Sequence, residues 1–366
     1  MHAILGGKNP HLQSFLVGGM ATPVDPDKQA SLNIHTIAAF KKMIAEAQQF
    51  VSQVYIPDLL AVASFYKDWA GYGGGVGNFM VFGEYPLDDE ADPDLFIKSG
   101  VIRNKDLSNI EEFDPSKITE QVAHSWYDYE GGKDQAIHPS EGETLPNYTG
   151  PEPPYERLDT DKSYSWLKSP RYDGIPMEVG PLARMLVNYG RGHEKVVGLV
   201  NHVLETLGVG PEALFSTLGR VAARGIETQI LVDKIGDFVD ELADNMGKGE
   251  LRIHDNSKWE PETWPKDSMG AGFHEAPRGA LSHWVHVKDG KIARYQCVVP
   301  STWNAGPRDA GGTPGPYEAA LVGTPVADPE QPIEILRTVH SFDPCMACGV
   351  HVVEPGGREV TRVKAR

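Results

Sequence analysis

The sequence has few cysteines, a deficit of basic residues and no long apolar run. Its 366 residues include three cysteines, too few for a disulfide framework. Lys and Arg number 34 against 51 Asp and Glu, and the net charge of −17 argues against a nucleic-acid partner, because nucleic-acid binding requires a basic surface. No apolar run could span a bilayer, and Met1–Pro10 has neither the basic start nor the cleavage site of a signal peptide. We therefore expect any export of the chain to depend on a partner.

Two of the three cysteines stand close together near the C-terminus. Cys345 and Cys348 have the spacing Cys-x-x-Cys, and His351 follows at the same interval. Pro344 restricts the backbone directly before the first thiol. Two thiols at this spacing can bind one metal ion or form a redox disulfide.

The spacing alone leaves several kinds of site open. A thioredoxin-type redox pair follows a strand and precedes a helix, whereas the pattern here indicates a helix before the cysteines and a strand after them. A structural zinc site needs a fourth ligand, usually from a second Cys-x-x-Cys, and the third cysteine, Cys297, is far away in sequence. Haem attachment requires the histidine directly after the second cysteine, so that interpretation fails. The remaining alternative is two buried thiols and an unrelated histidine.

Apolar residues at helical spacing dominate much of the chain. They predict helices over 31–69, from about 178, over 211–246 and over 329–340. We expect Asp27 or Ser31 to cap the first helix and Pro57 to break or kink it. Pro181 suits the first turn of the second helical stretch, and Arg184 in that stretch is expected to be a structural ion-pair partner.

Short strands and a long irregular region complete the pattern. Strands are predicted over 78–85 and 95–103, and a hairpin over 281–287 and 291–299, where Asp289-Gly290 lies between alternating apolar runs. Residues 106–170 lack periodicity but are rich in aromatic residues, so we expect an ordered excursion over a helical core. The glycine-rich stretch from Gly270 to Gly279 is predicted to be a loop that turns into the hairpin.

The sequence resembles the large subunit of nickel-iron hydrogenases. Asp-Pro-Cys-x-x-Cys-x-x-His, residues 343–351, is similar to the nickel-binding signature of that family. Five further blocks resemble family segments: 6–11, 124–127, 164–171, 178–184 and 275–279. The first of them is internal in the family but stands at the start here. The resemblance implies a mainly α fold, with long helices and small β hairpins near a metal site.

The resemblance also implies a set of metal ligands. Cys345 and Cys348 are expected to bind nickel, and Cys348 is expected to bridge to an iron that carries carbon monoxide and cyanide. His351 and the backbone carbonyl of Cys297 are expected to bind magnesium. The thiol of Cys297 needs no role as a ligand, and we interpret it as a small buried side chain in a strand.

Further residues are expected to line this site by resemblance. Arg278 lies over the open face between the metals in the family pattern, and Pro277 packs beside the diatomic ligands. Pro300 and Ser301 are expected near a cyanide, for which the serine hydroxyl is a possible donor. Asp343 is expected to pair with Arg278, whose guanidinium keeps its charge and therefore normally donates hydrogen bonds.

The resemblance divides the chain after His351. In the family a maturation protease cuts after this histidine once nickel-insertion proteins have loaded the metal. Residues 1–351 would then be part of a hydrogenase domain, and residues 352–366, from Val352, a maturation extension. Alternating apolar and polar residues predict a hairpin in this extension.

The chain lacks one part of the family pattern. The first nickel-binding cysteine pair, in an Arg-x-Cys-Gly-x-Cys block, does not occur, so the sequence supplies half of the nickel ligands. The expected function is the reversible heterolytic cleavage of dihydrogen in a heterodimer with an iron-sulfur small subunit, because three cysteines cannot also hold a cluster. By resemblance this is the uptake type, associated with the periplasmic face of a membrane through the small subunit. The alternatives are an inactive remnant and a zinc-stabilised binding module.

Overall fold

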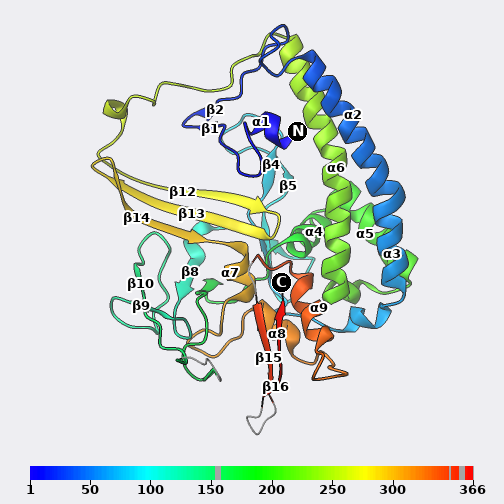
Figure 1. Cartoon of the computed structure of the whole chain (residues 1–366), viewed down its shortest axis with the longest axis vertical. Coiled ribbons are helices and arrows are strands. Elements are labelled where there is room, and N and C mark those ends of the chain that lie inside the picture. The colour runs from blue at the N-terminus through cyan, green and yellow to red at the C-terminus, as the bar shows by residue number, and fades with distance from the viewer. Residues whose placement is uncertain (153–157, 346–347, 354–358, 366) are drawn as a thin grey trace. The chain divides into compact units, whose positions relative to one another are not determined.

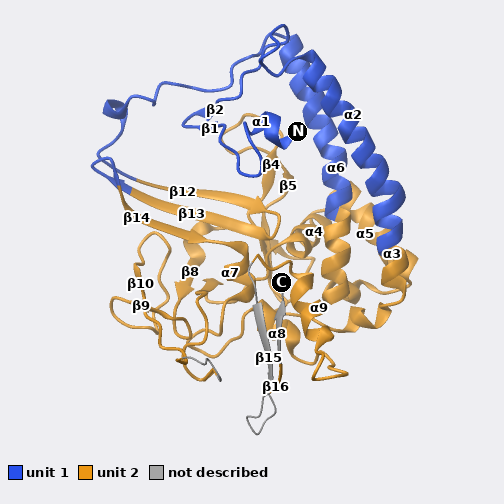
Figure 2. Cartoon of the chain, in the orientation of Figure 1, with its two compact units in different colours: residues 1–59, 227–268, 287–291 blue, residues 60–226, 269–286, 292–366 orange. Residues whose placement is uncertain are grey.

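The chain folds into two compact units (Figure 2). The computed structural model describes residues 1–152, 158–345, 348–353 and 359–365, and for the last two segments we describe the backbone. Unit 1 comprises residues 1–59, 227–268 and 287–291, and unit 2 comprises residues 60–226, 269–286 and 292–366. No membrane-spanning candidate occurs among the helices that the structure describes.

Unit 1 is built on two long helices that run side by side (Figure 1). These are α2 (Ile34–Phe50) and the part of α6 (Thr217–Gly247) from residue 227 onward. Their buried apolar residues recur at helical spacing and form one core with a residue from the preceding loop: Leu32, Ile37, Phe40, Ile44, Val239 and Met246. The smaller elements of this unit are α1 (His2–Leu5), β1 (Phe15–Leu16), β2 (Gly19–Met20) and the 3₁₀ turn η5 (Pro261–Thr263).

The first helix begins later than the sequence indicated. Asn33 caps α2, because its side-chain oxygen accepts hydrogen bonds of 3.0 Å from the N–H groups of both His35 and Thr36. The prediction that Asp27 or Ser31 caps this helix is therefore wrong. Asn33 satisfies two backbone donors that the first turn leaves without a helical partner.

The helix predicted over 31–69 changes character next to Pro57. After α2 the backbone widens into a π-helical turn, η1 (Val51–Tyr55), then continues as α3 (Ile56–Ser64) and the 3₁₀ helix η2 (Lys67–Gly71). Proline has no N–H to donate, and its ring displaces the carbonyl four residues earlier, so the preceding turn cannot keep regular α-helical bonds. The expected irregularity at Pro57 is thus a local widening of the helix.

Unit 2 has its main core around small sheets and the first turn of a helix. The sheets are β3–β6–β7, β4–β5, β8–β11 and β9–β10. Their strands are β3 (Phe79–Val81), β4 (Glu84–Pro86), β5 (Leu95–Ile97), β6 (Gly100–Ile102), β7 (Ile110–Glu111), β8 (Ile118–Gln121), β9 (Tyr127–Tyr129), β10 (Thr144–Pro146) and β11 (Ser169–Tyr172). The core residues are Met80, Phe82, Val101, Ile118, Tyr172, Met177, Val179, Ala280, Trp284, Val298 and Trp303.

The helices of unit 2 start at residues that the sequence marks. They are α4 (Pro181–Gly190), α5 (Glu194–Leu207), α7 (Pro300–Ala305), α8 (Pro316–Leu321) and α9 (Ile333–Ser341), with 3₁₀ turns η3 (Pro115–Lys117) and η4 (Pro211–Leu214). Pro181 is in the first turn of α4, as predicted. The helix predicted over 211–246 breaks after η4, because the Ser216 hydroxyl accepts a 2.9 Å hydrogen bond from Gly219 N–H and so caps the start of α6.

The irregular region 106–170 is an ordered excursion in its described part, as the aromatic content predicted. The Trp166 ring contacts Trp126 in an edge-on geometry and Tyr148 in a stacked one, with centroids 5.4 and 5.8 Å apart. The Tyr164 hydroxyl donates a 2.5 Å hydrogen bond to Glu318, and burial, followed by this carboxylate, raises the pKa of Tyr164 to about 12. The ring contacts order the excursion internally, and the hydrogen bond to Glu318 connects it to a helix of unit 2.

Three longer strands form the largest sheet, in the order β12–β13–β14 (Figure 1). They are β12 (Asp267–Ala276), β13 (Gly279–Lys288) and β14 (Lys291–Val298). The predicted hairpin is confirmed: Asp289 and Gly290 both have positive φ, 50° and 71°, as a tight two-residue turn requires. The loop predicted from Gly270 to Gly279 is wrong for its first part, because Gly270 to Ala276 lie in β12, whereas Pro277 and Arg278 do form the turn into β13.

The C-terminal segment forms a further antiparallel hairpin. Strand β15 (Cys348–Val353) pairs with β16 (Glu359–Ala365), with Cys348 opposite Ala365 and His351 opposite Arg362. The hairpin predicted in the tail is present, and its first strand begins before Val352. The division of the chain at residue 351 stays a prediction.

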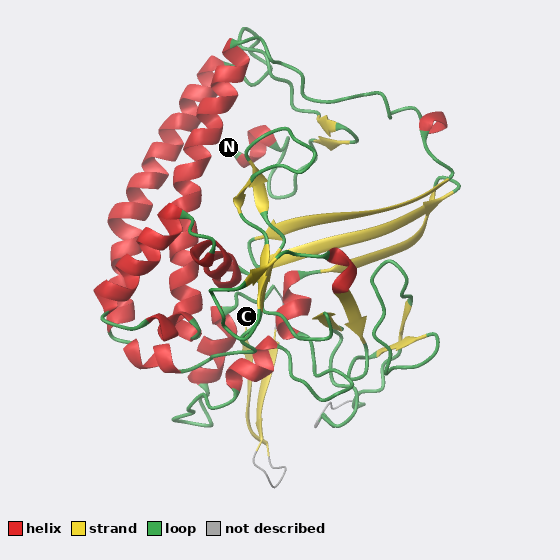
Figure 3. Cartoon of the chain, turned by 180° about the vertical axis from the view of Figure 1, so that it is seen from behind, coloured by secondary structure: helices red, strands yellow, loops and turns green. Residues whose placement is uncertain are grey.

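The prediction of a mainly α fold holds only in part, because helices are the larger fraction but strands are substantial. Helices account for 37% of the chain and strands for 20%, spread over many short sheets (Figure 3). The prediction underestimated strands because most have only two to four residues and show no measurable alternation, as β7 (Ile110–Glu111) illustrates.

Candidate metal centre

Arg278, expected from the sequence over the metal site, lies against Asp343. Its Nε donates a 2.8 Å hydrogen bond to the backbone oxygen of Asp343, and Nη2 lies 3.1 Å from the carboxylate Oδ1. Arg278 is in the turn between β12 and β13, and Asp343 follows α9. The two side chains are 38% and 40% exposed, so solvent screens their attraction and the contact orients the guanidinium more than it stabilises the fold.

Asp343 has a backbone conformation that non-glycine residues seldom adopt. Its φ is 58°, and its N–H donates to the carbonyl of His340, which makes it the left-handed residue that ends α9. Pro344 follows directly, although residues before proline are usually extended. Such a conformation persists only where neighbours hold it. Arg278 does so through two contacts, and Arg224 Nη2 donates a 3.0 Å hydrogen bond to the carbonyl of Ser341.

Cys345, the first predicted nickel ligand, lies beside Ser301. Its backbone N–H donates to the Ser301 hydroxyl oxygen over 3.4 Å. Ser301 is 2% exposed and stands with Pro300 at the start of α7, whereas Cys345 is exposed and has a free thiol. The structure therefore brings together four predicted site residues from three separate segments: Arg278, Ser301, Asp343 and Cys345.

The other predicted residues of the same signature lie in a strand for which we describe the backbone. Cys348, His351 and Val352 belong to β15, and their side chains lie outside the described residues. Their roles in binding metal and in processing stay predictions. Pro277 is described, and its carbonyl accepts a 2.9 Å hydrogen bond from Arg184 Nη2.

The third cysteine is half-buried and lies in β14. Cys297 has a free thiol, 4.0 Å from Nε2 of His283. Burial, followed by the nearby Glu120 carboxylate, raises the pKa of this thiol, so it stays protonated at neutral pH. The predicted place of Cys297 in a strand is confirmed, and the expectation that its carbonyl alone binds magnesium stays a prediction.

Glu120 is a buried carboxyl that the sequence analysis missed. It is 2% exposed, and its Oε2 accepts hydrogen bonds from Lys168 Nζ at 3.1 Å and Gln296 Nε2 at 2.5 Å. Burial raises the pKa of Glu120 in spite of the lysine. Its partner Gln296 directly precedes Cys297, so the group lies beside the strand position expected to contribute a metal-binding carbonyl.

A second buried pair that the sequence analysis missed lies next to residues 343–345, which we call the signature turn. Arg220 makes two 2.7 Å contacts with the carboxylate of Glu178, and its Nη1 donates to the carbonyl of Gly73 at 2.7 Å. The guanidinium carbon lies 3.8 Å from the centroid of the Phe342 ring, directly before Asp343. The available signals were a charged residue just before an apolar helix, Glu178, and a charged residue at a core position of a helix, Arg220. Because the two residues are far apart in sequence, the pattern did not show that they pair.

Among the described residues, Cys345 can supply one ligand to a metal site built from thiolates. Cys345 supplies a free, exposed thiol, and soft thiolate sulfur is the ligand type that the predicted signature calls for. Among the described side chains, no group of three or more His, Cys, Asp or Glu residues is placed to hold a metal ion. A complete site therefore needs donors beyond this set, of which Cys348 is the one predicted by the sequence.

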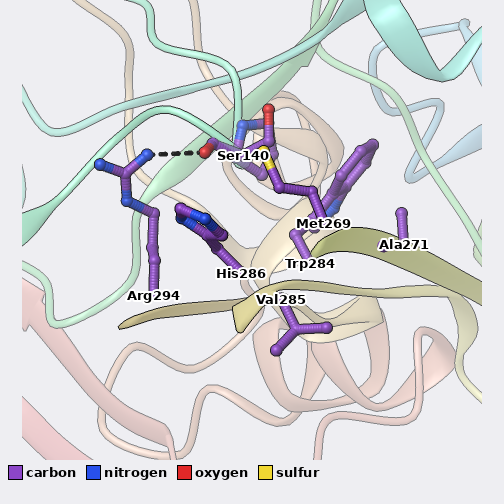
Figure 4. Close-up of a pocket in the computed structure, with 9 residues that line it drawn as sticks. Ser140, Met269, Ala271, Trp284, Val285, His286 and Arg294 are labelled. Atoms are coloured by element: carbon purple, nitrogen blue, oxygen red, sulfur yellow. Dashed lines mark hydrogen bonds between the residues drawn. The ribbon is translucent and has the colours of Figure 1, made fainter. Parts of the chain in front are cut away.

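A separate hollow lies on the large sheet (Figure 4). It encloses about 170 Å³ between β12, β13, β14 and the excursion, with His286, Arg294 and Trp284 among its lining residues. Arg294 Nη1 donates a 2.7 Å hydrogen bond to the carbonyl of Ser140 at its edge. Its described lining residues include none of the predicted metal-site residues, so this hollow is distinct from the turn that carries Cys345.

Comparison with known proteins agrees with the motif resemblance. The family model described as nickel-dependent hydrogenase matches residues 1–351. The uptake hydrogenase large subunit of Rhizobium leguminosarum bv. viciae is 44% identical over 382 residues, and the hydrogenase-1 large chain of Escherichia coli K12 is 41% identical over 381. Both alignments cover 100% of this chain and 64% of the relative. The chain thus spans less than two thirds of the length of these curated relatives.

Solved structures that resemble this chain in fold are also hydrogenases. A reduced, active form of the Ni-Fe-Se hydrogenase from Desulfomicrobium baculatum superposes with a TM-score of 0.76 at 33% identity, covering 94% of this chain and 64% of that one. The reduced Ni-Fe-Se hydrogenase from Desulfovibrio vulgaris Hildenborough gives 0.74 at 32% identity, with 94% and 66% covered. These identities and the match over residues 1–351 are sufficient to assign the family. The chain belongs to the nickel-dependent hydrogenase family.

Proposed function

We propose that this chain is the metal-binding portion of the catalytic large subunit of a nickel-iron hydrogenase, which cleaves dihydrogen reversibly and heterolytically. The observation that carries the proposal is the turn where Arg278, Asp343, Ser301 and Cys345 meet. A free thiol, a fixed guanidinium and a hydroxyl from three segments that meet around residues 343–345 provide a metal ligand and hydrogen-bond donors at one place. Segments beyond this chain supply the remaining nickel ligands.

The proposed ligands keep the roles that the signature implies. Cys345 and Cys348 would hold nickel, and Cys348 would also hold the iron that carries carbon monoxide and cyanide. His351 and the carbonyl of Cys297 would hold magnesium. Nickel and iron supply Lewis acidity and electron transfer when bound, which weakens the bond of dihydrogen toward heterolysis.

The residues of this chain then orient and hold charge around the reacting molecule. The Nε–H of Arg278 donates to the Asp343 carbonyl, which holds the positively charged guanidinium in one orientation. Ser301 is anchored in α7 and accepts from Cys345 N–H, so its hydroxyl hydrogen is available to a second acceptor, which we assign to a cyanide nitrogen. Pro277 is held by Arg184 at its carbonyl, and its ring would line the same side of the site.

The partners follow from the same assignment. Electrons leave through an iron-sulfur small subunit, which forms a heterodimer with the large subunit and connects it to the periplasmic face of a membrane in the manner of uptake enzymes. Nickel-insertion proteins load the site, and a maturation protease then removes residues 352–366. The end of the family match at residue 351 supports this boundary.

Metal analysis and hydrogen oxidation by the full-length subunit with its small subunit test the function. We expect nickel and iron together in the wild type, and loss of both nickel and activity in Cys345→Ser and Cys348→Ser, because a neutral hydroxyl is a poor ligand at a thiolate site. Cys297→Ala is the matched control and should keep its metals. Zinc alone would favour a binding module, and absence of metal an inactive remnant.

The intact mass of the active subunit tests the processing proposal. Cleavage after His351 removes Val352 to Arg366, so the purified large subunit should end at His351. A fully active enzyme that still ends at Arg366 contradicts the proposal.

A further inference from the structure

The first turn of α4 and the residue block before it carry charges that the catalytic proposal does not use. Arg184 is 3% exposed, and its Nη1 lies 2.8 Å from Oε2 of Glu275, which is 6% exposed. The other carboxylate oxygen of Glu275 accepts a 2.7 Å hydrogen bond from the backbone N–H of Phe82. The pair is therefore buried and has partners on both sides, as a buried ion pair requires.

Arg184 also holds the backbone that leads to Arg278. Its Nη1 donates to the carbonyl of Ala276 and its Nη2 to the carbonyl of Pro277, both at 2.9 Å. The planar guanidinium thus contacts three consecutive residues, 275 to 277, with one rigid group. Arg278 is the next residue, so any movement of this contact moves its Cα.

Two glycines bring the same segments into close backbone contact. A Cβ on Gly180 would lie 2.8 Å from the carbonyl oxygen of Arg278, and a Cβ on Gly279 would lie 2.5 Å from the nitrogen of Gly180. Both have positive φ, 120° and 128°, which side chains disfavour. The turn that carries Arg278 is therefore packed against the start of α4 without room for displacement.

The same segment holds Asp343 from the other side. Glu178 binds Arg220 through two 2.7 Å contacts, and Arg220 packs on the ring of Phe342, the residue before Asp343. The backbone of Glu178 is itself fixed, because its N–H donates to Asn78 and its carbonyl accepts from Met80. One short segment is thus connected by buried charges to both members of the Arg278–Asp343 pair.

We propose that residues 178–184 form a bracket that positions Arg278 relative to Asp343, with Arg184 as the positioning residue for Arg278. The inference rests on the proposed hydrogenase function for its kinetic test. Arg184 acts through the backbone of the turn and touches neither metal nor dihydrogen. Its loss should displace the Arg278 guanidinium while the metal ligands stay in place.

The first experiment uses Arg184→Lys in the full-length complex. A lysine ammonium can reach Glu275 but cannot bind the carboxylate and two carbonyls in one plane. We expect kcat to fall about tenfold or more, since a shift of about 1 Å at a reacting group can cost 100-fold, while KM and nickel content stay near wild type. An unchanged kcat, or a loss of nickel in proportion to the loss of kcat, would overturn the positioning role.

A double-mutant cycle separates positioning from general stability. If Arg184 acts through Arg278, then adding Arg184→Lys to Arg278→Lys should change kcat less than about twofold, because the group being positioned is already altered. Effects that multiply independently would show that Arg184 serves another purpose.

Arg171→Lys is the matched control. Arg171 is fully buried and also binds one carboxylate, Asp309 at 2.8 Å, and two carbonyls, those of Pro170 and Thr313. It should lower the melting temperature as Arg184→Lys does, but show no coupling to Arg278. Equal coupling of both variants to Arg278 would mean that substitution of any buried arginine has this effect, and it would overturn the inference.

Hydrogen exchange, measured by mass spectrometry on the same complexes, makes the test independent of activity. Arg184→Lys should accelerate exchange of the amides in residues 276–281, and Arg171→Lys should not. A wild-type complex without hydrogen oxidation contradicts the proposed function alone, because the exchange comparison still reports on the bracket. Unchanged exchange at 276–281 in Arg184→Lys contradicts the bracket alone.

Discussion

Replacing Arg220 by methionine removes the charge beneath the signature turn while keeping an unbranched side chain of similar length. Glu178, which is 1% exposed, then loses both 2.7 Å contacts and becomes a buried carboxylate without its cationic partner. Breaking a buried ion pair from one side costs about 3–5 kcal/mol, because the remaining charge is uncompensated. That range includes the loss of the contact between the guanidinium and the Phe342 ring, which contributes up to about 2 kcal/mol when desolvated.

The assay is thermal unfolding of the full-length subunit, followed by circular dichroism. For a unit of this size, about 1 kcal/mol corresponds to roughly 2 °C in melting temperature, so Arg220→Met should lower it by about 6–10 °C. Adding Glu178→Gln removes the stranded charge and should restore about half of the loss. Arg103→Met is the control, because its pairs with Glu111 and Asp173 are both partly exposed and each should contribute less than about 1 kcal/mol.

Two results would refute this reasoning. A melting temperature of Arg220→Met within about 2 °C of the wild type would mean that Glu178 finds another partner or that water enters the site. A double variant no more stable than Arg220→Met would mean that the stranded charge is not the cause of the loss.

Two further predictions concern parts of the chain away from the signature turn. Asn33→Ala should destabilise unit 1 by about 1 kcal/mol in chemical denaturation, through loss of the cap of α2. Asn33→Asp should lose less, because it keeps the capping oxygen and loses the hydrogen bond that Nδ2 donates to the Lys28 carbonyl. The Glu84 carboxylate, 2.8 Å from Nδ1 of His274, raises the pKa of that imidazole. Its stabilising contribution is therefore complete below about pH 6.5 and is lost as the pH rises through the raised pKa. The melting temperature of His274→Gln should fall below that of the wild type at about pH 6 and approach it at high pH, and a constant difference across this range would contradict the assignment.

The sequence predicted those features of the fold that depend on neighbouring residues. Apolar spacing located α2, Asp289-Gly290 located the β13–β14 turn, and Pro57 located the widened helical turn. The errors also come from the local pattern, where it was misleading. The Ser216 cap was hidden in a continuous helical pattern, and β12 was interpreted as a loop because Gly270 and Gly272 interrupt any alternation.

In the candidate site, too, the sequence predicted which residues lie together when they are close in the chain, but not when they are far apart. Asp343 and Cys345 are two residues apart, so the motif by itself places them together. The Arg184–Glu275 pair joins residues 91 positions apart, and nothing in the local pattern of either block specifies the other. Pairs of this kind arise from tertiary packing, so a sequence shows that each charge is unusual but not which residue neutralises it.

The left-handed backbone at Asp343 limits which residues this position can accept under selection. With φ at 58°, glycine, asparagine and aspartate are the residue types that adopt the conformation without a large penalty. The contact with Arg278 Nη2 requires a side-chain oxygen at this reach, which removes glycine. Handedness and chemistry together leave aspartate and asparagine, and the positive charge of Arg278 distinguishes between them. Substitution at this position is therefore expected to be slow even where neighbouring residues vary. A new residue must both adopt the left-handed backbone and keep the contact with Arg278.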